Sequence, residues 1–228
     1  MSAVATTLRG VGQTLITAGV VILLFVVYEL YFTGLETARE QSQLRNEIED
    51  LWESGGGSYE TVNDPAKPPA KIPLGSGIAV IRIPRFGRDW GKVVLEGVTL
   101  SDLKRGPGHY PGTQLPGQVG NFVVSGHRTT YGAPFNRIDE LKQGDAIVVE
   151  TRDTWYTYRV STTEIVPPTA VDVTYPVPHQ REAKATIARI TLTSCHPKYS
   201  ARQRIIVYGQ LADTQPKAAG TLPPALAA

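Results

Sequence analysis

The most apolar part of the chain is one stretch near the N-terminus, and shorter apolar runs are distributed over the rest of the sequence. Residues 10–28 carry no formal charge, and residues 20–27 form an uninterrupted apolar run. At about 1.5 Å of rise per residue, a helix of this length approaches the roughly 30 Å hydrocarbon thickness of a bilayer. The pattern predicts one transmembrane helix over residues 10–31, preceded by a short N-terminal segment, residues 1–9.

Two other interpretations of this stretch are weaker. A buried core helix is disfavoured because the stretch lies at the terminus and no other part of the chain is comparably apolar. A cleaved signal peptide is the closer alternative, but the stretch is longer than a typical signal core and no Ala-x-Ala cleavage site follows it. As a membrane span, the stretch would place Tyr28 and Tyr31 at the interface.

The basic residues on either side of this helix bear on its orientation in the membrane. Arg9 and the N-terminal amine lie on one side, and Arg39 and Arg45 lie on the other, where acidic residues contribute little to orientation. We predict a single-pass protein of the cell membrane, with the N-terminus in the cytoplasm and the rest of the chain outside the cell.

Residues 32–71 separate the predicted span from the folded part of the chain. Their first half predicts a polar, partly amphipathic helical stalk, with apolar residues at Leu44, Ile48, Leu51 and Trp52. Residues 54–73 contain Gly-Gly-Gly and four prolines, typical of a semi-flexible tether that holds a domain away from a membrane. Residues 213–228 are rich in Ala, Pro and Gly and are predicted to be disordered, which leaves residues 72–212 as the folded domain.

Residues 72–212 have the pattern of an all-β domain. Short β-branched or aromatic runs recur between turn signals and predict eight strands, at residues 78–83, 92–96, 121–125, 146–151, 155–160, 162–166, 185–193 and 204–211. Two stretches, residues 101–105 and 136–142, are predicted as short helices, each ended by glycine or Pro-Gly. Strands this numerous and closely spaced favour a β-barrel or a β-sandwich.

Composition and charge exclude several kinds of function. The 228 residues include 23 Lys and Arg, 21 Asp and Glu and a single cysteine, so the formal net charge is +2. One thiol cannot form an internal disulfide or supply a multi-cysteine zinc or iron–sulfur site, and no zinc-ligand or EF-hand spacing occurs. The balanced charge lacks the basic stripe of a nucleic-acid-binding protein, so we expect no nucleic-acid partner.

The single cysteine, Cys195, ends a predicted strand whose alternation indicates where its side chain points. The even positions include Ile190 and Leu192 and form the more apolar face, although Ile187 breaks the pattern, and Cys195 belongs to the odd face. A lone cysteine is most often a small buried hydrophobic residue. Because this one is predicted to point away from the core, and outside a membrane would be exposed to oxidation, a functional thiol is the better interpretation.

A nucleophilic thiol needs a base or a positive charge nearby, because an ordinary thiol with a pKa of about 8.5 is only slightly ionised at pH 7. Among the four histidines, His127 follows the predicted strand 121–125 and could project into a cleft. His196 adjoins Cys195, where neighbouring side chains of a strand diverge. His109 and His179 lie in Pro-rich loops and are interpreted as solvated.

Two arginines follow the cysteine. Arg202 and Arg204 lie seven and nine residues after Cys195, and Arg204 opens an apolar strand. An arginine in this place is usually a charged edge residue. If its strand pairs as a hairpin with the strand ending in Cys195, the guanidinium can lie beside the thiol. It would then offer donors to a carbonyl oxygen that becomes negative during acyl transfer.

Together these motifs resemble the sortases. The run Thr-Leu-Thr-Ser-Cys at residues 191–195 is similar to the Thr-Leu-x-Thr-Cys strand end of that family, with an arginine nine residues on and the histidine in an upstream Ser-Gly-His. Residues 108–112, 125–135 and 195–204 are similar to the class E, housekeeping-type sortases of Gram-positive actinobacteria. Ser194 replaces the usual threonine, so a hydroxyl is kept and a methyl group is lost.

The resemblance implies an eight-stranded β-barrel behind the one transmembrane helix, and it implies a role for particular residues. Cys195 would be the nucleophile, His127 the group that transfers protons, and Arg204 the residue that stabilises the oxyanion and orients the substrate. The resemblance further implies substrate contacts by Tyr110, Thr193 and Ser194, with the tyrosine linked to an alanine preference in class E. It implies no metal and no organic cofactor.

The implied activity is that of a membrane-anchored cysteine transpeptidase. Its substrates would be secreted proteins with a C-terminal signal, Leu-Pro-x-Thr-Gly in most of the family and Leu-Ala-x-Thr-Gly in class E. The enzyme would cleave between Thr and Gly through a thioacyl intermediate and pass the protein to the amine of a peptidoglycan precursor of the lipid II type. Membrane lipid around the anchor would be a further partner.

Two alternatives stay open. One is a pilin-polymerising sortase, whose acceptor amine is a protein lysine. Such class C enzymes carry a lid with an aromatic residue after Asp-Pro, whereas Asp64-Pro65 is followed here by Ala66. The other is a membrane-tethered β-barrel binding module without catalysis, in which Cys195 is incidental.

Overall fold

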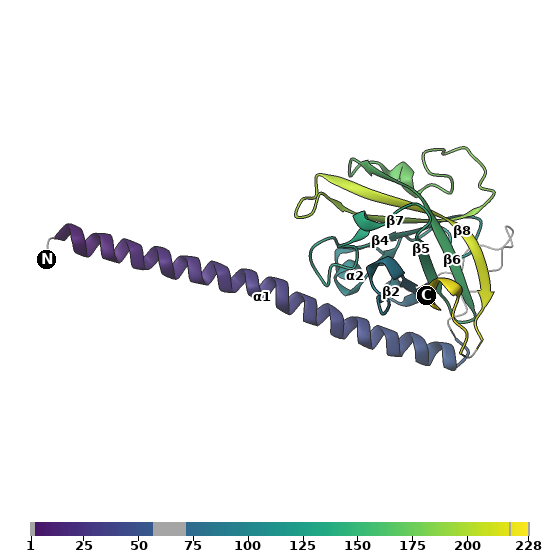
Figure 1. Cartoon of the computed structure of the whole chain (residues 1–228), viewed down its shortest axis with the longest axis horizontal. Coiled ribbons are helices and arrows are strands. Elements are labelled where there is room, and N and C mark those ends of the chain that lie inside the picture. Colours follow the sequence, from purple (N-terminus) through teal and green to yellow (C-terminus); the bar gives the residue numbers. More distant parts are fainter. Residues whose placement is uncertain (1–2, 57–71, 219, 228) are drawn as a thin grey trace.

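One long helix precedes a closed β-barrel (Figure 1). The computed structural model describes residues 3–56, 72–218 and 220–227. The helix, α1, spans Ala3–Glu53. Eight strands of the described residues close the barrel, namely β1 (Gly77–Arg82), β2 (Gly91–Glu96), β3 (Gly108–His109), β4 (Gly120–Ser125), β5 (Ala146–Glu150), β6 (Thr154–Val166), β7 (Ala188–His196) and β8 (Gln203–Pro216).

Around the barrel the strands follow the order β1-β2-β3-β4-β7-β8-β6-β5, and β5 pairs with β1. The pairs β2–β3 and β4–β7 are parallel. Short helical segments connect the strands or follow them, namely η1 (Pro84–Phe86), α2 (Leu100–Arg105), η2 (Ile138–Glu140), η3 (Val171–Thr174) and α3 (Pro224–Ala227). Because parallel strands run in the same direction, β4 and β7 end at the same edge of the barrel.

The all-β class and the eight-stranded barrel expected from the sequence are confirmed, but two details of the strand assignment are wrong. The runs predicted at residues 155–160 and 162–166 belong to one strand, β6, whose register with β8 shifts between Val160 and Thr162. The eighth strand is instead β3, whose two residues are too few to produce an alternating pattern.

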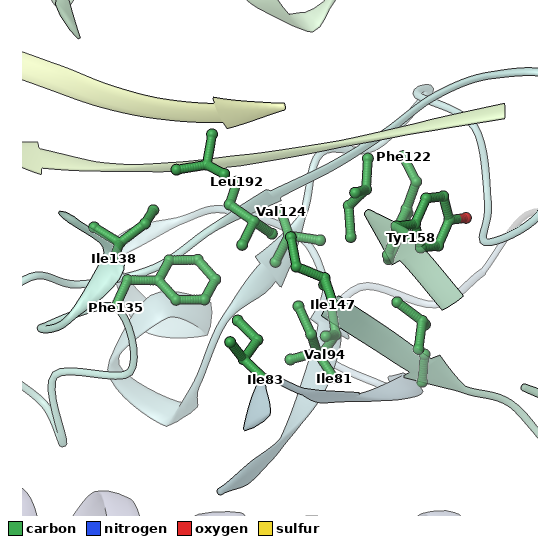
Figure 2. Packing of buried hydrophobic residues seen from close by; sticks show 14 of the residues in the cluster. Ile81, Ile83, Val94, Phe122, Val124, Phe135, Ile138, Ile147, Tyr158 and Leu192 are labelled. Atoms are coloured by element: carbon green, nitrogen blue, oxygen red, sulfur yellow. The ribbon is translucent and has the colours of Figure 1, made fainter. Parts of the chain in front are cut away.

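Alternate residues of the strands fill the inside of the barrel (Figure 2). β4 contributes Phe122 and Val124, and β7 contributes Ile190 and Leu192, all of them fully buried. Burying one such side chain stabilises a fold by roughly 1.5–3 kcal/mol. The even face of β7 is therefore the core face, and alternation directs Cys195 out of the barrel, as predicted.

The outer face of β7 and β8 is covered as well. Thr191 lies on this face, yet it is fully buried. The segment between β6 and β7 brings Val173 against Ile206 and Tyr208 of β8, and these residues form a second apolar cluster. Further along the same face, at the end of β7, Cys195 is only partly buried.

The C-terminal half of α1 packs against the outside of the barrel. Leu44 and Ile48 are buried against residues of β1 and β2, namely Val80, Val93 and Leu95. The first half of residues 32–71 is helical, as expected for the stalk, and its apolar stripe packs directly against the barrel. The predicted linker residues 57–71 lie outside the described residues.

The N-terminal half of α1 contains the predicted membrane span. Ala5–Tyr28 is long and apolar enough to cross a membrane, and its apolar window is not buried inside the molecule. This exposure argues against a buried core helix. In Figure 1 the helix continues without interruption from this span into the half that contacts the barrel.

The C-terminal segment is more ordered than its composition predicts. Residues 213–216 belong to β8 and pair with residues 154–157 of β6. Ala225 and Leu226 of α3 pack against a small cluster that includes Trp155. The prediction of a disordered tail from residue 213 is wrong for these residues, because strand pairing and burial outweigh the Ala- and Pro-rich composition.

Two substitutions near β7 test the assignment of its core face. Leu192→Ala should lower the free energy of unfolding by about 2–5 kcal/mol, because it leaves a cavity inside the barrel. Ile187→Ala should cost less than about 1 kcal/mol, since Ile187 is 37% exposed. Urea unfolding of the detergent-solubilised chain, followed by tryptophan fluorescence, measures both. Equal losses would contradict the assignment.

Candidate active site

Cys195 and Arg204 face each other across the β7–β8 hairpin. In the antiparallel register Cys195 is the direct partner of Arg204, as Thr193 is of Ile206. Directly opposed side chains lie on the same face of a sheet, with Cβ atoms about 4.5–5.5 Å apart. The hairpin on which the prediction for Arg204 depended is thus present. In its register Arg204, and not Arg202, lies directly opposite Cys195.

One end of the Arg204 guanidinium is held by the hairpin itself. Its Nη1 donates to the backbone carbonyls of Ala201 and Gln203, each at 3.0 Å. Both bonds use the same nitrogen, which leaves the other N–H groups of the planar fork without a partner in the described residues. A cation held in this way can donate to an oxygen that becomes negative beside the thiol.

His127 reaches the same edge of the barrel from β4. Ser125 is the parallel partner of Thr193. His127 follows Ser125 by two residues, and Cys195 follows Thr193 by two residues. The carbonyl of His127 accepts a hydrogen bond from the N–H of Phe135 at 3.1 Å, which closes the loop behind the histidine. The imidazole and the thiol therefore come from the ends of adjacent parallel strands.

The His127 ring is partly buried, and one of its nitrogens is unused. Nδ1 lies 3.3 Å from Thr130 Oγ1, and the ring packs against Tyr131 with 5.0 Å between centroids. Nε2 is buried and has no hydrogen-bond partner among the described residues. Burial, followed by the positive charge of Lys104, lowers the pKa of His127 below its usual 6.5. The ring is therefore mainly neutral at pH 7, and with its proton on Nδ1 it can accept a proton at Nε2.

Arg128, which the sequence reasoning did not single out, ties the histidine loop to the cysteine strand. Its side chain is only 2% exposed. Nε donates to the carbonyl of Asn136 at 2.9 Å, Nη1 donates to the carbonyl of Cys195 at 3.3 Å, and Nη2 pairs with Asp139 at 2.8 Å. The clue to this role in the sequence is the position of Arg128 directly after the motif histidine, His127. A buried arginine satisfied in this way holds the backbone of the thiol residue.

Ser194 and Gly126 form a second link between the same two strands. The Ser194 hydroxyl donates to the carbonyl of Gly126 at 2.7 Å, and the Gly126 N–H donates to the carbonyl of Thr193 at 3.1 Å. A Cβ on Gly126 would lie 2.7 Å from the Phe135 ring, so this close approach requires glycine. Ser194 is 2% exposed, and its hydroxyl links the two strands; the substrate contact expected from the sequence stays a prediction.

The other two predicted substrate contacts lie on the outer face. Thr193 precedes Cys195 by two residues on that face of β7 and is 6% exposed. Tyr110 continues the ladder beyond β3, since its N–H donates to the carbonyl of Val123 at 3.0 Å, and its side chain is partly buried. Alternation places Tyr110 on the face opposite His109, outside the barrel.

His109 and His196 do not lie on the outer face that carries Cys195 and Arg204. His109 was expected to be solvated but is 2% exposed, with Nδ1 at 2.6 Å from Glu96 Oε2 and Nε2 at 2.8 Å from Thr113 Oγ1. Its ring lies against Phe122 inside the barrel, so tertiary packing overrides the loop-like local sequence. His196 follows Cys195 in β7, so alternation directs it to the opposite face.

His179 holds the segment between β6 and β7 against the barrel. Nδ1 lies 2.7 Å from Asp172, and Nε2 lies 2.7 Å from Glu164, which also accepts a hydrogen bond from the Tyr208 hydroxyl. The hydrogen bond to Asp172, followed by that to Glu164, raises the pKa of His179 above 6.5. His179 is exposed but not simply solvated, because it joins this segment to β6.

Comparison with known proteins shows the family of this chain. The family model described as "Sortase domain" matches residues 81–212. The chain is 35% identical to "Sortase SrtE1" of Streptomyces coelicolor over 220 residues, which are 93% of this chain and 59% of SrtE1. The chain belongs to the sortase family. Sortases are cysteine transpeptidases, and the similarity to SrtE1 supports assignment to class E.

Solved structures support the same assignment. The structure of sortase E from Streptomyces avermitilis is 43% identical, with a TM-score of 0.62 over 68% of this chain and 99% of that one. The structure of Sortase E1 from Streptomyces coelicolor with a tripeptide in the active site is 36% identical, with a TM-score of 0.61 over 67% and 97% of the two chains. In the described part of this sortase, no group of three or more His, Cys, Asp or Glu could hold a metal ion.

Arg128→Lys should slow the reaction of this sortase with peptide substrates. A lysine cannot reach the two carbonyls and Asp139 at once, and one lost bond to a charged group in a buried site costs about 1.5–3 kcal/mol, or about tenfold or more in rate. Steady-state transfer measures the effect, and Arg159→Lys on the exposed side of β6 is the matched control. Equal rates for the two variants would show that Arg128 does not position Cys195.

The His179 contacts should weaken as the pH rises. The folded-state pKa of His179 is raised, so its stabilising effect is complete below about 6.5, the usual value, and is lost as the pH rises through the folded-state pKa. We expect faster hydrogen exchange of residues 170–180 at high pH, after correction for intrinsic rates, and no such change in His179→Gln. An equal pH effect in both proteins would contradict this assignment.

Proposed function

We propose that this chain is a membrane-anchored transpeptidase that cleaves a sorting signal of the form Leu-Ala/Pro-x-Thr-Gly between Thr and Gly. One observation carries the proposal, the convergence of Cys195, Arg204 and His127 at one edge of the barrel. Cys195 and Arg204 are direct cross-strand partners, and His127 leaves the neighbouring parallel strand with a buried, unpaired Nε2.

The proposed acylation uses these three residues. Nε2 of His127 takes the proton of the Cys195 thiol, and the sulfur attacks the carbonyl carbon of the substrate threonine. The carbonyl oxygen becomes negative and accepts hydrogen bonds from the free edge of Arg204. When the tetrahedral intermediate collapses, the Thr–Gly bond breaks and His127 returns its proton to the leaving glycine amine. A thioester at Cys195 remains.

Transfer repeats these steps in reverse order. An incoming amine attacks the thioester carbonyl, and His127 accepts the proton that the amine loses. The carbon–sulfur bond then breaks, Cys195 leaves as a thiolate, and the proton on His127 restores the resting pair. Because the thiol and the imidazole exchange a proton, they titrate as a coupled pair.

The peptide would lie along the outer face beside the thiol. Thr193 and Tyr110 are the residues of that face that we assign to substrate contact, whereas the Ser194 hydroxyl is occupied by its bond to Gly126. The tripeptide in the active site of Sortase E1 from Streptomyces coelicolor supports a peptide ligand for this chain as well.

The apolar helix supports our proposal for the placement of the chain in the cell. Ala5–Tyr28 would span the cell membrane once, with the N-terminus in the cytoplasm and the barrel outside the cell. The acceptor would be the amine of a peptidoglycan precursor of the lipid II type. Clients would be secreted proteins that carry the signal at their C-terminus.

Peptide transfer by the full chain in detergent tests the proposal. Wild type should join Leu-Ala-x-Thr or Leu-Pro-x-Thr to triglycine, and Cys195→Ala should form no thioester. Arg204→Lys should be about 100-fold slower or worse, because an ammonium does not reproduce the planar fork of donors. Arg202→Lys in the same hairpin is the matched control and should retain most of the rate.

Two results would refute the proposal. The first is a wild-type chain that forms neither a thioester nor a transfer product with either peptide. The second is a Cys195→Ala chain as active as wild type. Equal rates for Arg204→Lys and Arg202→Lys would refute only the oxyanion role of Arg204 and would leave the rest of the proposal standing.

A further inference from the structure

The C-terminal half of α1 is bound to the barrel by buried polar contacts as well as by apolar packing. Gln41 is 8% exposed, and its side chain makes three hydrogen bonds. Its Oε1 accepts from the N–H of Val93 at 2.8 Å, and its Nε2 donates to the carbonyls of Val93 at 3.2 Å and Arg105 at 2.9 Å. A buried amide with three hydrogen bonds fixes one register of the helix on the barrel, because any shift would leave polar groups without partners.

Near its exit from the predicted span, α1 contacts two elements beside the active site. Thr37 is 4% exposed, and its hydroxyl donates to the carbonyl of Lys104 in α2 at 3.1 Å. The methyl group of Thr37 lies 3.0 Å from the position that a Cβ on Gly132 would occupy. Gly132 belongs to the loop that begins at His127, so the helix touches the histidine loop directly.

Lys104 and Tyr131 connect this contact to His127. The Lys104 ammonium lies 5.4 Å from the centre of the Tyr131 ring, which in turn packs against the His127 ring. Lys104 is also the charge that acts on His127. A chain of direct contacts therefore runs from Thr37 through α2 and Tyr131 to the imidazole.

The histidine loop needs such support because of its backbone. Tyr131, Gly132 and Ala133 are three successive residues with positive φ, at 50°, 68° and 41°. Only glycine adopts this region without cost, and the other two residues do so only where surrounding contacts hold them. Thr37 packs at the middle of the three.

We propose that the segment of α1 from Thr37 to Ile48 is a positioning element for His127, and not merely a link between membrane and barrel. Docking of the helix holds α2 and the loop after His127 in the conformation that directs the imidazole toward Cys195. Thr37 and Gln41 are its positioning residues, and they act through Lys104, Tyr131 and the loop backbone. The inference rests on the proposed function of His127.

Three variants of the full chain in detergent test this inference. Gln41→Ala removes the three bonds of the buried amide, and Thr37→Val removes the hydroxyl at nearly constant volume. Gln43→Ala is the matched control, since Gln43 is a solvent-exposed glutamine on the same helix. We expect kcat/KM for peptide transfer to fall about fivefold to tenfold in the first two variants and to stay unchanged in the third. Thr37→Ser, which keeps the hydroxyl, should recover most of the rate.

The protonation of His127 provides a second readout that does not depend on turnover. A loosened loop would expose the imidazole and move it from Lys104, both of which raise its pKa. The His127 signal, assigned with His127→Gln and followed by NMR of labelled histidine, should therefore titrate at higher pH in Gln41→Ala and Thr37→Val. The acidic limb of kcat/KM should shift in the same direction.

Two outcomes would overturn the inference. In one, Gln41→Ala and Thr37→Val match Gln43→Ala in rate and in His127 titration. In the other, the rate falls but the titration and the pH profile stay those of wild type, which would limit α1 to a role in stability. Failure of the proposed function itself is distinguishable, because wild type would then transfer no peptide while the titration could still shift.

Discussion

The backbone pairing of β7 with its two neighbours is the constraint on which the active site depends. Its parallel pairing with β4 brings the ends of both strands to one edge, so His127 and Cys195 emerge side by side. Its antiparallel pairing with β8 sets Arg204 directly opposite the thiol. A shift of one residue in either register would turn a reacting group to the other face of the sheet, into the packed barrel interior.

Buried polar bonds then hold the strand ends in place. Arg128 and Ser194 join the cysteine strand to the histidine loop, and Gln41 joins α1 to the barrel. Each of these groups is nearly inaccessible to solvent, so an unmade bond would carry the full cost of desolvation. Because of this cost, each hydrogen-bonded connection holds the two elements in one register. The apolar contacts of the core oppose mainly the separation of the elements. Buried polar bonds of the same kind join Thr37 and Gln41 of α1 to α2 and β2, beside the histidine loop.

Much of the fold and the central residue of the site could be predicted from local patterns. Alternation along residues 186–195 identified the core face of β7 and the outward direction of Cys195, because side-chain direction in a strand has a strict period of two. The resemblance to sortase motifs, and not spacing alone, singled out His127 and Arg204. Composition excluded disulfides, since there is one cysteine. These properties depend on neighbours in the sequence, and they are therefore readable from it.

Tertiary structure decided which distant groups meet. The register of β8 chose Arg204 over Arg202, and packing buried His109 inside the barrel although its loop sequence indicated a solvated side chain. Arg128 acquired its role in part from the Cys195 carbonyl, 67 residues along the chain, and α1 docked on the barrel where the sequence indicated a helical stalk. These outcomes depend on strand register, burial and hydrogen bonding between residues that are not neighbours in the sequence; Arg204 lies nine residues after Cys195, and Cys195 lies 67 residues after Arg128. Local periodicity contains no information about such partners, because their energies arise only when the barrel closes.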